Sequence, residues 1–136
     1  TWEGATSAVT RDPNVGALSH KWTLDRSPEW SPDGTRIVFQ YRSHDHYEIM
    51  VMNADGSGRT LLTKSPSLAD PPINSVSPAW SPDGQHIVYL TDARGRWELF
   101  VMNADGSEQR PMFEEALNDL TFEYHNVDEQ VVDWSP

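Results

Sequence analysis

The sequence predicts an all-β protein that contains two copies of one four-stranded antiparallel unit. Three observations support this fold class: an internal repeat at an offset of 50 residues, tight-turn motifs at matched places in both copies, and short runs rich in Val, Ile, Phe and Tyr between the turns. Runs of this kind, bounded by Pro, Gly, Asn and Asp, are typical of strands and are too short for helices.

The repeat joins residues 27–63 to residues 77–113 without a gap. The two segments are identical at 17 of 37 positions. Both open with Ser-Pro-x-Trp-Ser-Pro-Asp-Gly, and both later contain Val-Met-Asn-Ala-Asp-Gly-Ser. A period of this length indicates one supersecondary unit per copy.

Two turn motifs punctuate each unit. In Trp-Ser-Pro-Asp-Gly, Pro presets φ at the second turn position and Gly accepts the conformation that follows, and Asn-Ala-Asp-Gly is a second tight turn. We expect the repeated Asp side chains to bond to nearby backbone amides and not to be catalytic carboxylates. The residues of these motifs are Trp30, Ser31, Pro32, Asp33, Gly34, Asn53, Asp55 and Gly56, then Trp80, Ser81, Pro82, Asp83, Gly84, Asn103, Asp105 and Gly106.

Four strands are expected in each unit. Their predicted ranges are 27–31, 35–42, 47–53 and 58–63, then 77–81, 85–91, 97–103 and 108–113. The runs Ile37–Phe39 and Ile49–Met52 are apolar on both faces, which predicts sheets covered on both sides. We expect Trp30 and Trp80 to occupy equivalent positions between units, and the matched pair Tyr47 and Trp97 to lie in the core.

A β-propeller provides this kind of cover, because neighbouring blades pack on both faces of each sheet, and blade repeats run to roughly 40–50 residues. A β-solenoid is the competing architecture, but its rungs usually have shorter periods. We therefore interpret residues 1–136 as a single β-propeller unit. Its blades are 27–63 and 77–113, with a partial blade or N-terminal extension over 1–26 and the start of a further blade at 131–136.

An incomplete ring has an energetic consequence. Propellers typically close with about four to eight blades. Two open blades would leave an apolar sheet face at each end, and burying one such face is worth several kcal/mol at about 25 cal/mol per Å². Bare apolar faces favour association. We therefore expect either a longer propeller or copies of this chain that complete a ring together, as a dimer or a trimer.

The two turn motifs resemble the WD40-like (PD40) repeat of the TolB propeller family. The resemblance covers 27–63, 77–113 and the stub at 131–136. Similar repeats occur in periplasmic translocation proteins, in the propellers of prolyl-oligopeptidase-like and tricorn-like peptidases, and in oligogalacturonate lyases. The resemblance thus implies either a non-catalytic binding module or scaffold for protein or other macromolecular partners, which we favour, or the propeller domain of an enzyme. It also implies a periplasmic or secreted location.

Composition narrows the partners. The sequence has ten Lys and Arg residues and 21 Asp and Glu residues. The resulting net charge of −11 argues against binding to nucleic-acid phosphates. No apolar run approaches the roughly 18 residues of a membrane span, so no membrane insertion is expected. The sequence has no cysteine, which excludes disulfides, thiol catalysis and Cys-ligated zinc.

The sequence has few motifs that are typical of catalytic, cofactor-binding or metal-binding sites. The sequence contains no Gly-x-Ser-x-Gly elbow, His-Glu-x-x-His, phosphate loop or dinucleotide fingerprint, so we expect no enzyme activity, catalytic residue or cofactor. His44 and His46 are the candidates for a metal site, because an i, i+2 pair on an extended segment can ligate a metal. Their counterparts are Arg94 and Arg96, so the pair is not part of the repeat, and a solvated loop is the favoured interpretation.

The segment 53–57 and its copy place oxygen-bearing side chains at alternate positions, as calcium loops do. An EF-hand loop requires Gly at its sixth position, Glu at its twelfth and flanking helices. Counted from Asn53 the twelfth residue is Lys64, and counted from Asn103 the sixth is Glu108. The sequence therefore predicts hairpin turns at both places.

Overall fold

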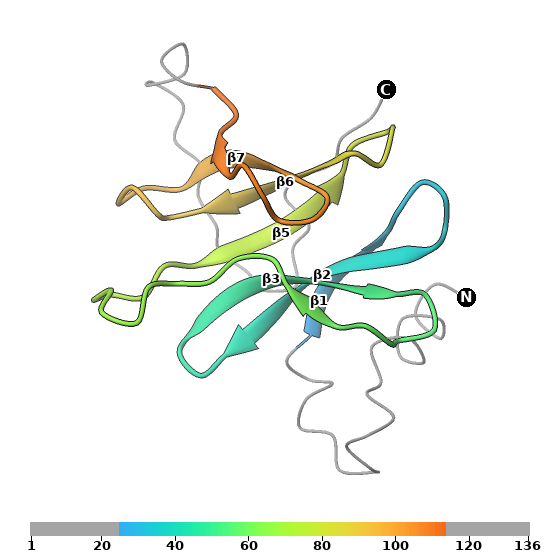
Figure 1. Ribbon diagram of the computed structural model, residues 1–136. Coiled ribbons are helices and arrows are strands. Elements are labelled where there is room, and N and C mark those ends of the chain that lie inside the picture. Colours follow the sequence, from blue (N-terminus) through green and yellow to red (C-terminus); the bar gives the residue numbers. More distant parts are fainter. Residues whose placement is uncertain (1–24, 114–136) are drawn as a thin grey trace.

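The computed structural model describes residues 25–113, which form two four-stranded antiparallel sheets and no helix (Figure 1). Within each sheet the strands follow the order of the chain. This confirms the predicted all-β fold. The strands are β1 (Asp25–Trp30), β2 (Arg36–Ser43), β3 (His46–Asn53), β4 (Thr60–Leu61), β5 (Ser75–Trp80), β6 (His86–Thr91), β7 (Glu98–Asn103) and β8 (Arg110–Pro111).

The two sheets share one register at the offset of 50 residues. Trp30 pairs with Ile37 in the first sheet, and Trp80 pairs with Ile87 in the second. The two tryptophans therefore occupy equivalent positions, as expected. Because the register of every inner strand pair repeats, the first sheet serves as a template for comparing local environments in the second.

The first strand of each sheet, β1 or β5, starts two residues before its predicted start at Ser27 or Ser77. The pairing of each strand with its neighbour shifts register around this serine, which has φ of 49° in one blade and 50° in the other. A β-bulge with its extra residue in the left-handed region accounts for the shift. The outer strands β4 and β8 are shorter than predicted, with two residues each.

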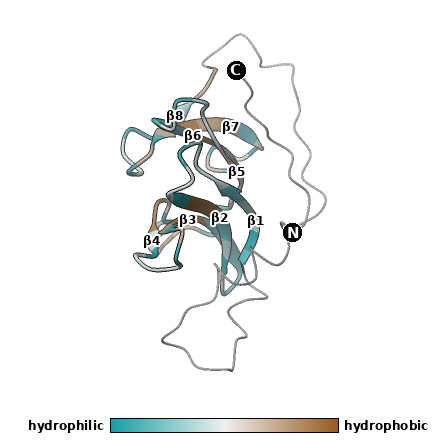
Figure 2. Ribbon diagram, turned by 90° about the vertical axis from the view of Figure 1, so that its right-hand side faces the viewer, coloured by the Kyte–Doolittle hydropathy of each residue, from teal (hydrophilic) through white to brown (hydrophobic). Residues whose placement is uncertain are grey.

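The main hydrophobic core lies between the sheets, which stack one above the other (Figure 2). The first sheet and its loop contribute Val38, Ile49, Val51 and Leu62, and the second contributes Trp80, Ile87, Tyr89 and Met102. Two hydrogen bonds from the Trp80 backbone and indole nitrogens reach Glu29, at 3.0 and 3.1 Å. The two blades therefore fold around a shared interior.

A second cluster lies on the other face of the first sheet. Ile37 and Phe39 are 1% and 0% exposed there, and Val88 and Leu90, on the face of the second sheet turned away from the first, are 2% and 0% exposed. The expectation that the centres of these outer faces are open to water is therefore wrong. The side chains at the centre of both faces are already buried.

Two further expectations need adjustment. Tyr47 and Trp97 are only partly buried: Tyr47 is the second residue of β3 and Trp97 directly precedes β7, so both lie near a hairpin tip. Residues 25 and 26 belong to β1, so the first blade starts earlier than predicted. The rest of the segment 1–26 and all of 131–136 lie outside the described residues. No helix in the described range is long and apolar enough to cross a bilayer.

Candidate functional site

Antiparallel order places the loops at two opposite ends of the sheets (Figure 1). The β1–β2 and β3–β4 turns, with their counterparts in the second blade, lie at one end, which we call the turn end. The β2–β3 and β6–β7 hairpins and the loop between the blades lie at the other, which we call the hairpin end. The repeated turn motifs occupy the turn end, and His44 and His46, which are not repeated, lie at the hairpin end.

The Trp-Ser-Pro-Asp-Gly turn is held by its aspartate. Asp33 Oδ1 accepts hydrogen bonds from the Ser31 hydroxyl at 2.6 Å and from the Thr35 backbone amide at 3.0 Å. Gly34, at φ 72°, donates its backbone N–H to the Ser31 carbonyl. Asp83 accepts the same serine-hydroxyl and backbone bonds in the second blade. The carboxylate therefore stabilises the turn from within.

The Asn-Ala-Asp-Gly turn uses the same device. Asp55 Oδ1 accepts bonds from the backbone amide and the hydroxyl of Ser57, and Asn53 donates its side-chain amide to that hydroxyl at 3.1 Å. Asp105 and Asn103 repeat these bonds. Strands flank both turns, as the hairpin prediction requires.

The turn end carries fixed negative charge. The hydrogen bond from the Ser31 hydroxyl, followed by those from Thr35, lowers the pKa of Asp33 to about 2. Serine hydroxyl bonds, followed by backbone amide bonds, also lower the pKa of Asp55, Asp83 and Asp105. Hydrogen bonds to the ionised form favour it. All four carboxylates therefore stay charged at neutral pH while facing water.

At the hairpin end, the structure separates the two candidate metal ligands. His44 is an exposed turn residue with φ of 50°, whereas His46 begins β3. The two do not share one extended segment, so the geometry assumed for a joint site is absent. Among residues 25–113, no group of three His, Asp or Glu side chains is placed to hold a metal ion.

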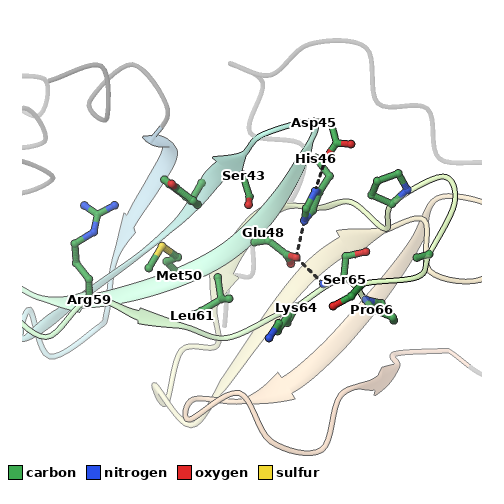
Figure 3. A pocket seen from close by; sticks show the side chains of 14 residues that line it. Ser43, Asp45, His46, Glu48, Met50, Arg59, Leu61, Lys64, Ser65 and Pro66 are labelled. Atoms are coloured by element: carbon green, nitrogen blue, oxygen red, sulfur yellow. Dashed lines mark hydrogen bonds and ion pairs between the residues drawn. The ribbon is translucent and has the colours of Figure 1, made fainter.

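His46 instead bridges two carboxylates (Figure 3). Its Nδ1 lies 2.9 Å from Asp45 Oδ1, and its Nε2 lies 2.9 Å from Glu48 Oε1. Partial burial opposes protonation of the imidazole, but the hydrogen bonds to Asp45 and Glu48 and their negative charge outweigh it and raise the pKa of His46. Sequence reasoning singled out His46 as a weak metal candidate in a solvated loop and did not foresee its bonds to Asp45 and Glu48.

Glu48 is the centre of this cluster, and sequence reasoning missed it. Its residue is 3% exposed, and its carboxylate accepts bonds from the Thr63 hydroxyl and the Ser65 backbone amide, both at 2.6 Å. The signal was present in the repeat, since Glu48 and Glu98 are identical at matched positions. The cluster fastens the start of the inter-blade loop to β3.

A pocket of about 580 Å³, which we call the β4 pocket, opens beside this cluster (Figure 3). Tyr41, Met50 and Leu61 supply apolar lining, and Lys64 and Arg59 supply cations. Arg59 also forms a bidentate ion pair with Asp25, with both N–O distances at 3.0 Å. The pocket thus combines an apolar wall with charged groups.

These features define a protein class: two neighbouring blades of a β-propeller, joined by a shared core and carrying the same turn chemistry. A family model agrees. The chain belongs to the TolB beta propeller domain family (PD40), whose model matches residues 13–129. This confirms the resemblance seen in the turn motifs.

The chain is similar in structure to parts of TolB proteins and of peptidases. A protein described as TolB from Agrobacterium tumefaciens is 25% identical, with a TM-score of 0.54 over 64% of this chain and 29% of that one. The AtxE2 isopeptidase is 25% identical, with a TM-score of 0.51 over 79% of this chain and 18% of that one. A puromycin-hydrolyzing peptidase of Mycobacterium tuberculosis, at 15% identity and a TM-score of 0.55 over 66% of this chain and 14% of that one, shows the fold alone.

The chain therefore spans less than a third of the length of each of these proteins. No curated protein matches the sequence. The comparisons establish a propeller similar to TolB and to the propeller domains of peptidases.

Proposed function

We propose that this chain is part of a TolB-like β-propeller that acts as a non-catalytic binding module or scaffold for a protein or another macromolecule. The observation that carries the proposal is the use of the repeated carboxylates. Asp33 and Asp55, with their counterparts Asp83 and Asp105, bond to their own turns and keep their charge facing water. The motif thus builds the blade and presents one acidic end.

The chemistry of that end favours a basic partner surface. Four ionised aspartates, held in place by short turns, act on a partner as preorganised charges, and complementary charge steers association and sets its orientation. The net charge of −11 acts in the same direction. The resemblance to periplasmic translocation proteins supports a periplasmic or secreted location for this binding.

A second candidate is the propeller domain of a peptidase. It is favoured by the AtxE2 isopeptidase, which matches a larger share of this chain than the TolB protein does at the same identity. In that case the hydrolytic residues belong to a domain beyond these 136 residues, and the propeller controls access or contacts substrate. The oligogalacturonate-lyase alternative requires a histidine-rich metal centre, and residues 25–113 offer no such cluster.

The test places a photo-crosslinking amino acid at Gln85 in one variant and at Ala93 in another. Both positions are exposed, but Gln85 lies at the turn end and Ala93 at the hairpin end. In an extract of the source organism we expect a discrete crosslinked protein at Gln85 that disappears when the salt concentration is raised. Equal capture at both positions, or none, would contradict the acidic turn end as the binding surface.

The second candidate is tested on the same protein. Hydrolysis of puromycin or an isopeptide by the purified chain would overturn the non-catalytic proposal. The substitution Gln85→Lys is also made in a longer polypeptide that contains this chain. If that substitution abolishes peptidase activity, the result would favour a propeller that handles substrate for a peptidase domain.

A further inference from the structure

An open groove of about 530 Å³, which we call the inter-blade groove, lies between the two blades at the turn end. It shares no lining residue with the β4 pocket at the hairpin end. Both blades contribute to its walls, the first through the start of β2 and the second through the start of β6 and the β7–β8 turn. The lining residues are Arg36, Gln85, His86, Asn103, Ala104 and Asp105.

Backbone contacts fix the walls of this groove. Ala104 donates its backbone N–H to the Gln85 carbonyl at 3.0 Å, which joins the β7–β8 turn to the start of β6. The β5–β6 turn adjoins the first blade, since a Cβ on Gly84 would lie 3.6 Å from Pro32 Cδ. The shape of the groove is therefore set by the packing of the two blades.

Arg36 supplies a cation that is held in place. Its guanidinium carbon lies 4.9 Å from the centroid of the Trp80 ring, and Trp80 is 2% exposed. The indole nitrogen of Trp80 is itself bonded to the Glu29 carbonyl. Because a cation is attracted to the face of a tryptophan ring, the buried indole fixes the half-buried arginine beside the groove.

The N–H donors of this arginine have no protein acceptor. Among residues 25–113, the Arg36 guanidinium makes no side-chain hydrogen bond and no ion pair. Arg59 and Arg94, in contrast, each bond to a carboxylate through two nitrogens. The guanidinium fork matches the geometry of a carboxylate. Arg36 therefore offers the groove a positioned binding group for such an anion.

Fixed negative charge surrounds this cation. Asp105 lines the same groove, and Asp33 and Asp83 lie in the neighbouring turns. These carboxylates repel a simple anion, so an anionic group is accepted best when positive charge accompanies it. Gln85 adds an exposed side-chain amide, which can bond to a peptide backbone. The groove thus suits a polypeptide that carries both signs of charge.

We propose that the inter-blade groove binds a carboxylate of a partner polypeptide in which basic residues flank that carboxylate. Arg36 donates its N–H groups to the carboxylate, and Asp105 attracts a neighbouring basic side chain. The inference rests on the proposed function, in which the turn end faces a basic partner surface, and it names the group recognised within that surface. The acidic turn end steers the partner, and the groove sets its orientation.

The test titrates the full chain with Lys-Lys-Glu-Lys-Lys and with Lys-Lys-Gln-Lys-Lys, both acetylated and amidated. Binding is followed by NMR at the Trp80 indole N–H resonance, which Trp80→Phe identifies. General attraction to a chain of net charge −11 favours the glutamine peptide, because it carries one more positive charge. The proposed site predicts the reverse order, with the glutamate peptide binding about tenfold more tightly.

Three variants test whether Arg36 causes the preference for glutamate. Arg36→Gln should abolish it, and Arg42→Gln should keep it, since that change removes the same charge from an exposed residue near the other end of β2. Arg36→Lys retains a cation over Trp80 without the guanidinium fork and should keep only part of it. Circular dichroism confirms that each variant folds.

A third peptide distinguishes the two sources of a carboxylate. Lys-Lys-Gln-Lys-Lys with a free C-terminal carboxylate is compared with its amidated form. An Arg36-dependent gain from the free carboxylate alone would assign the groove to the end of a chain. A gain from glutamate alone would assign it to an acidic side chain.

If neither carboxylate improves binding to the unmodified chain, the carboxylate site is overturned. Binding of the glutamine peptide would then still support the acidic turn end, and partner capture at Gln85 tests the proposed function separately. A preference for glutamate that persists in Arg36→Gln would also overturn the proposal, because it would place the carboxylate away from Arg36.

Discussion

Two identical residues at matched positions have different roles in the two blades. Glu48 is buried and accepts bonds from Thr63, Ser65 and His46. Glu98 is paired with Arg94 and Arg96 at the edge of the second hairpin, and the hydrogen bonds from Arg94, followed by Arg96, lower its pKa to about 2 despite partial desolvation. One repeat position thus anchors a loop in one blade and joins a surface ion cluster in the other.

This difference predicts unequal costs of truncation. Glu48→Ala leaves the Ser65 amide and the Thr63 hydroxyl without their acceptor, which costs about 2–3 kcal/mol of unfolding free energy. Glu98→Ala removes ion pairs with two arginines whose side chains are half exposed and solvent-screened, and should cost less, about 1 kcal/mol. Urea denaturation of the two variants measures both values. Equal costs would contradict the assigned roles.

The raised pKa of His46 predicts pH-dependent stability. A group whose pKa is higher in the folded state stabilises the fold fully below its unfolded pKa, about 6.5 for histidine, and loses that contribution as the pH rises through the folded value. We therefore expect the midpoint temperature of thermal unfolding to decrease as the pH is raised from about 6 to about 8.

His46→Gln should flatten that slope, because glutamine does not titrate. His86→Gln, which removes a histidine at the turn end, is the matched control for histidine count. Differential scanning fluorimetry across the pH range gives the slopes. A slope in His46→Gln as steep as in the unmodified chain would exclude the Asp45–His46–Glu48 cluster as its source.

Sequence reasoning reached the turn residues but missed most of the hairpin end. Turn chemistry is local, so Asp33 and Asp55 could be assigned to their own turns from neighbouring residues alone. Two partners of Glu48, Thr63 and Ser65, lie 15 and 17 residues away, and their proximity depends on the path of the inter-blade loop. No periodicity in the sequence encodes that path.

At the scale of elements, strand existence and order could be predicted because hydrophobic runs and turns alternate in both repeats. The bulges at Ser27 and Ser77 could not, since a register shift depends on which backbone groups find partners across the sheet. Ser77 shows such a partner, because its backbone amide donates to the Gln40 side chain of the other blade at 2.9 Å. Tertiary contacts thus set the strand starts.

The β7–β8 turn touches the neighbouring blade, and this predicts a large effect at one glycine. Gly106 has φ of 89°, and a Cβ there would lie 3.2 Å from the Leu62 carbonyl oxygen. Gly106→Ala should therefore cost more than about 2 kcal/mol, the sum of left-handed strain and a clash. Gly95→Ala, at φ 85° with open space, should cost about 1 kcal/mol.

Chemical denaturation of both glycine variants measures the difference. Comparable losses would mean that the backbone near Leu62 yields to the added methyl group. A larger loss at Gly106 would show that the turn and the neighbouring blade are packed rigidly against each other.

At the scale of the whole molecule, the shared core couples the blades. Trp80 is 2% exposed, belongs to the cluster formed by both sheets, and has Arg36 of the first blade over its ring at 4.9 Å. Cation–π contact and burial both depend on the first blade being folded. The blades are therefore expected to unfold in one transition.

Trp80→Ala should cost about 3–5 kcal/mol, as large-to-small changes in cores do. Trp30→Ala, at the equivalent position but only partly buried, should cost less. Guanidinium unfolding monitored by circular dichroism and by tryptophan fluorescence gives the costs and tests cooperativity. Separate transitions in the unmodified chain would show that the blades fold independently.

The sequential strand order has a kinetic consequence. Among residues 25–113, every hydrogen-bonded strand pair joins neighbours in the chain, so each hairpin there closes a short loop and no described strand waits for a distant segment. Local pairing of this kind lowers contact order and speeds folding relative to β-sandwiches with long crossovers. The slow step is then the meeting of two finished sheets, where the similar repeats also offer a wrong partner: the corresponding sheet of another molecule.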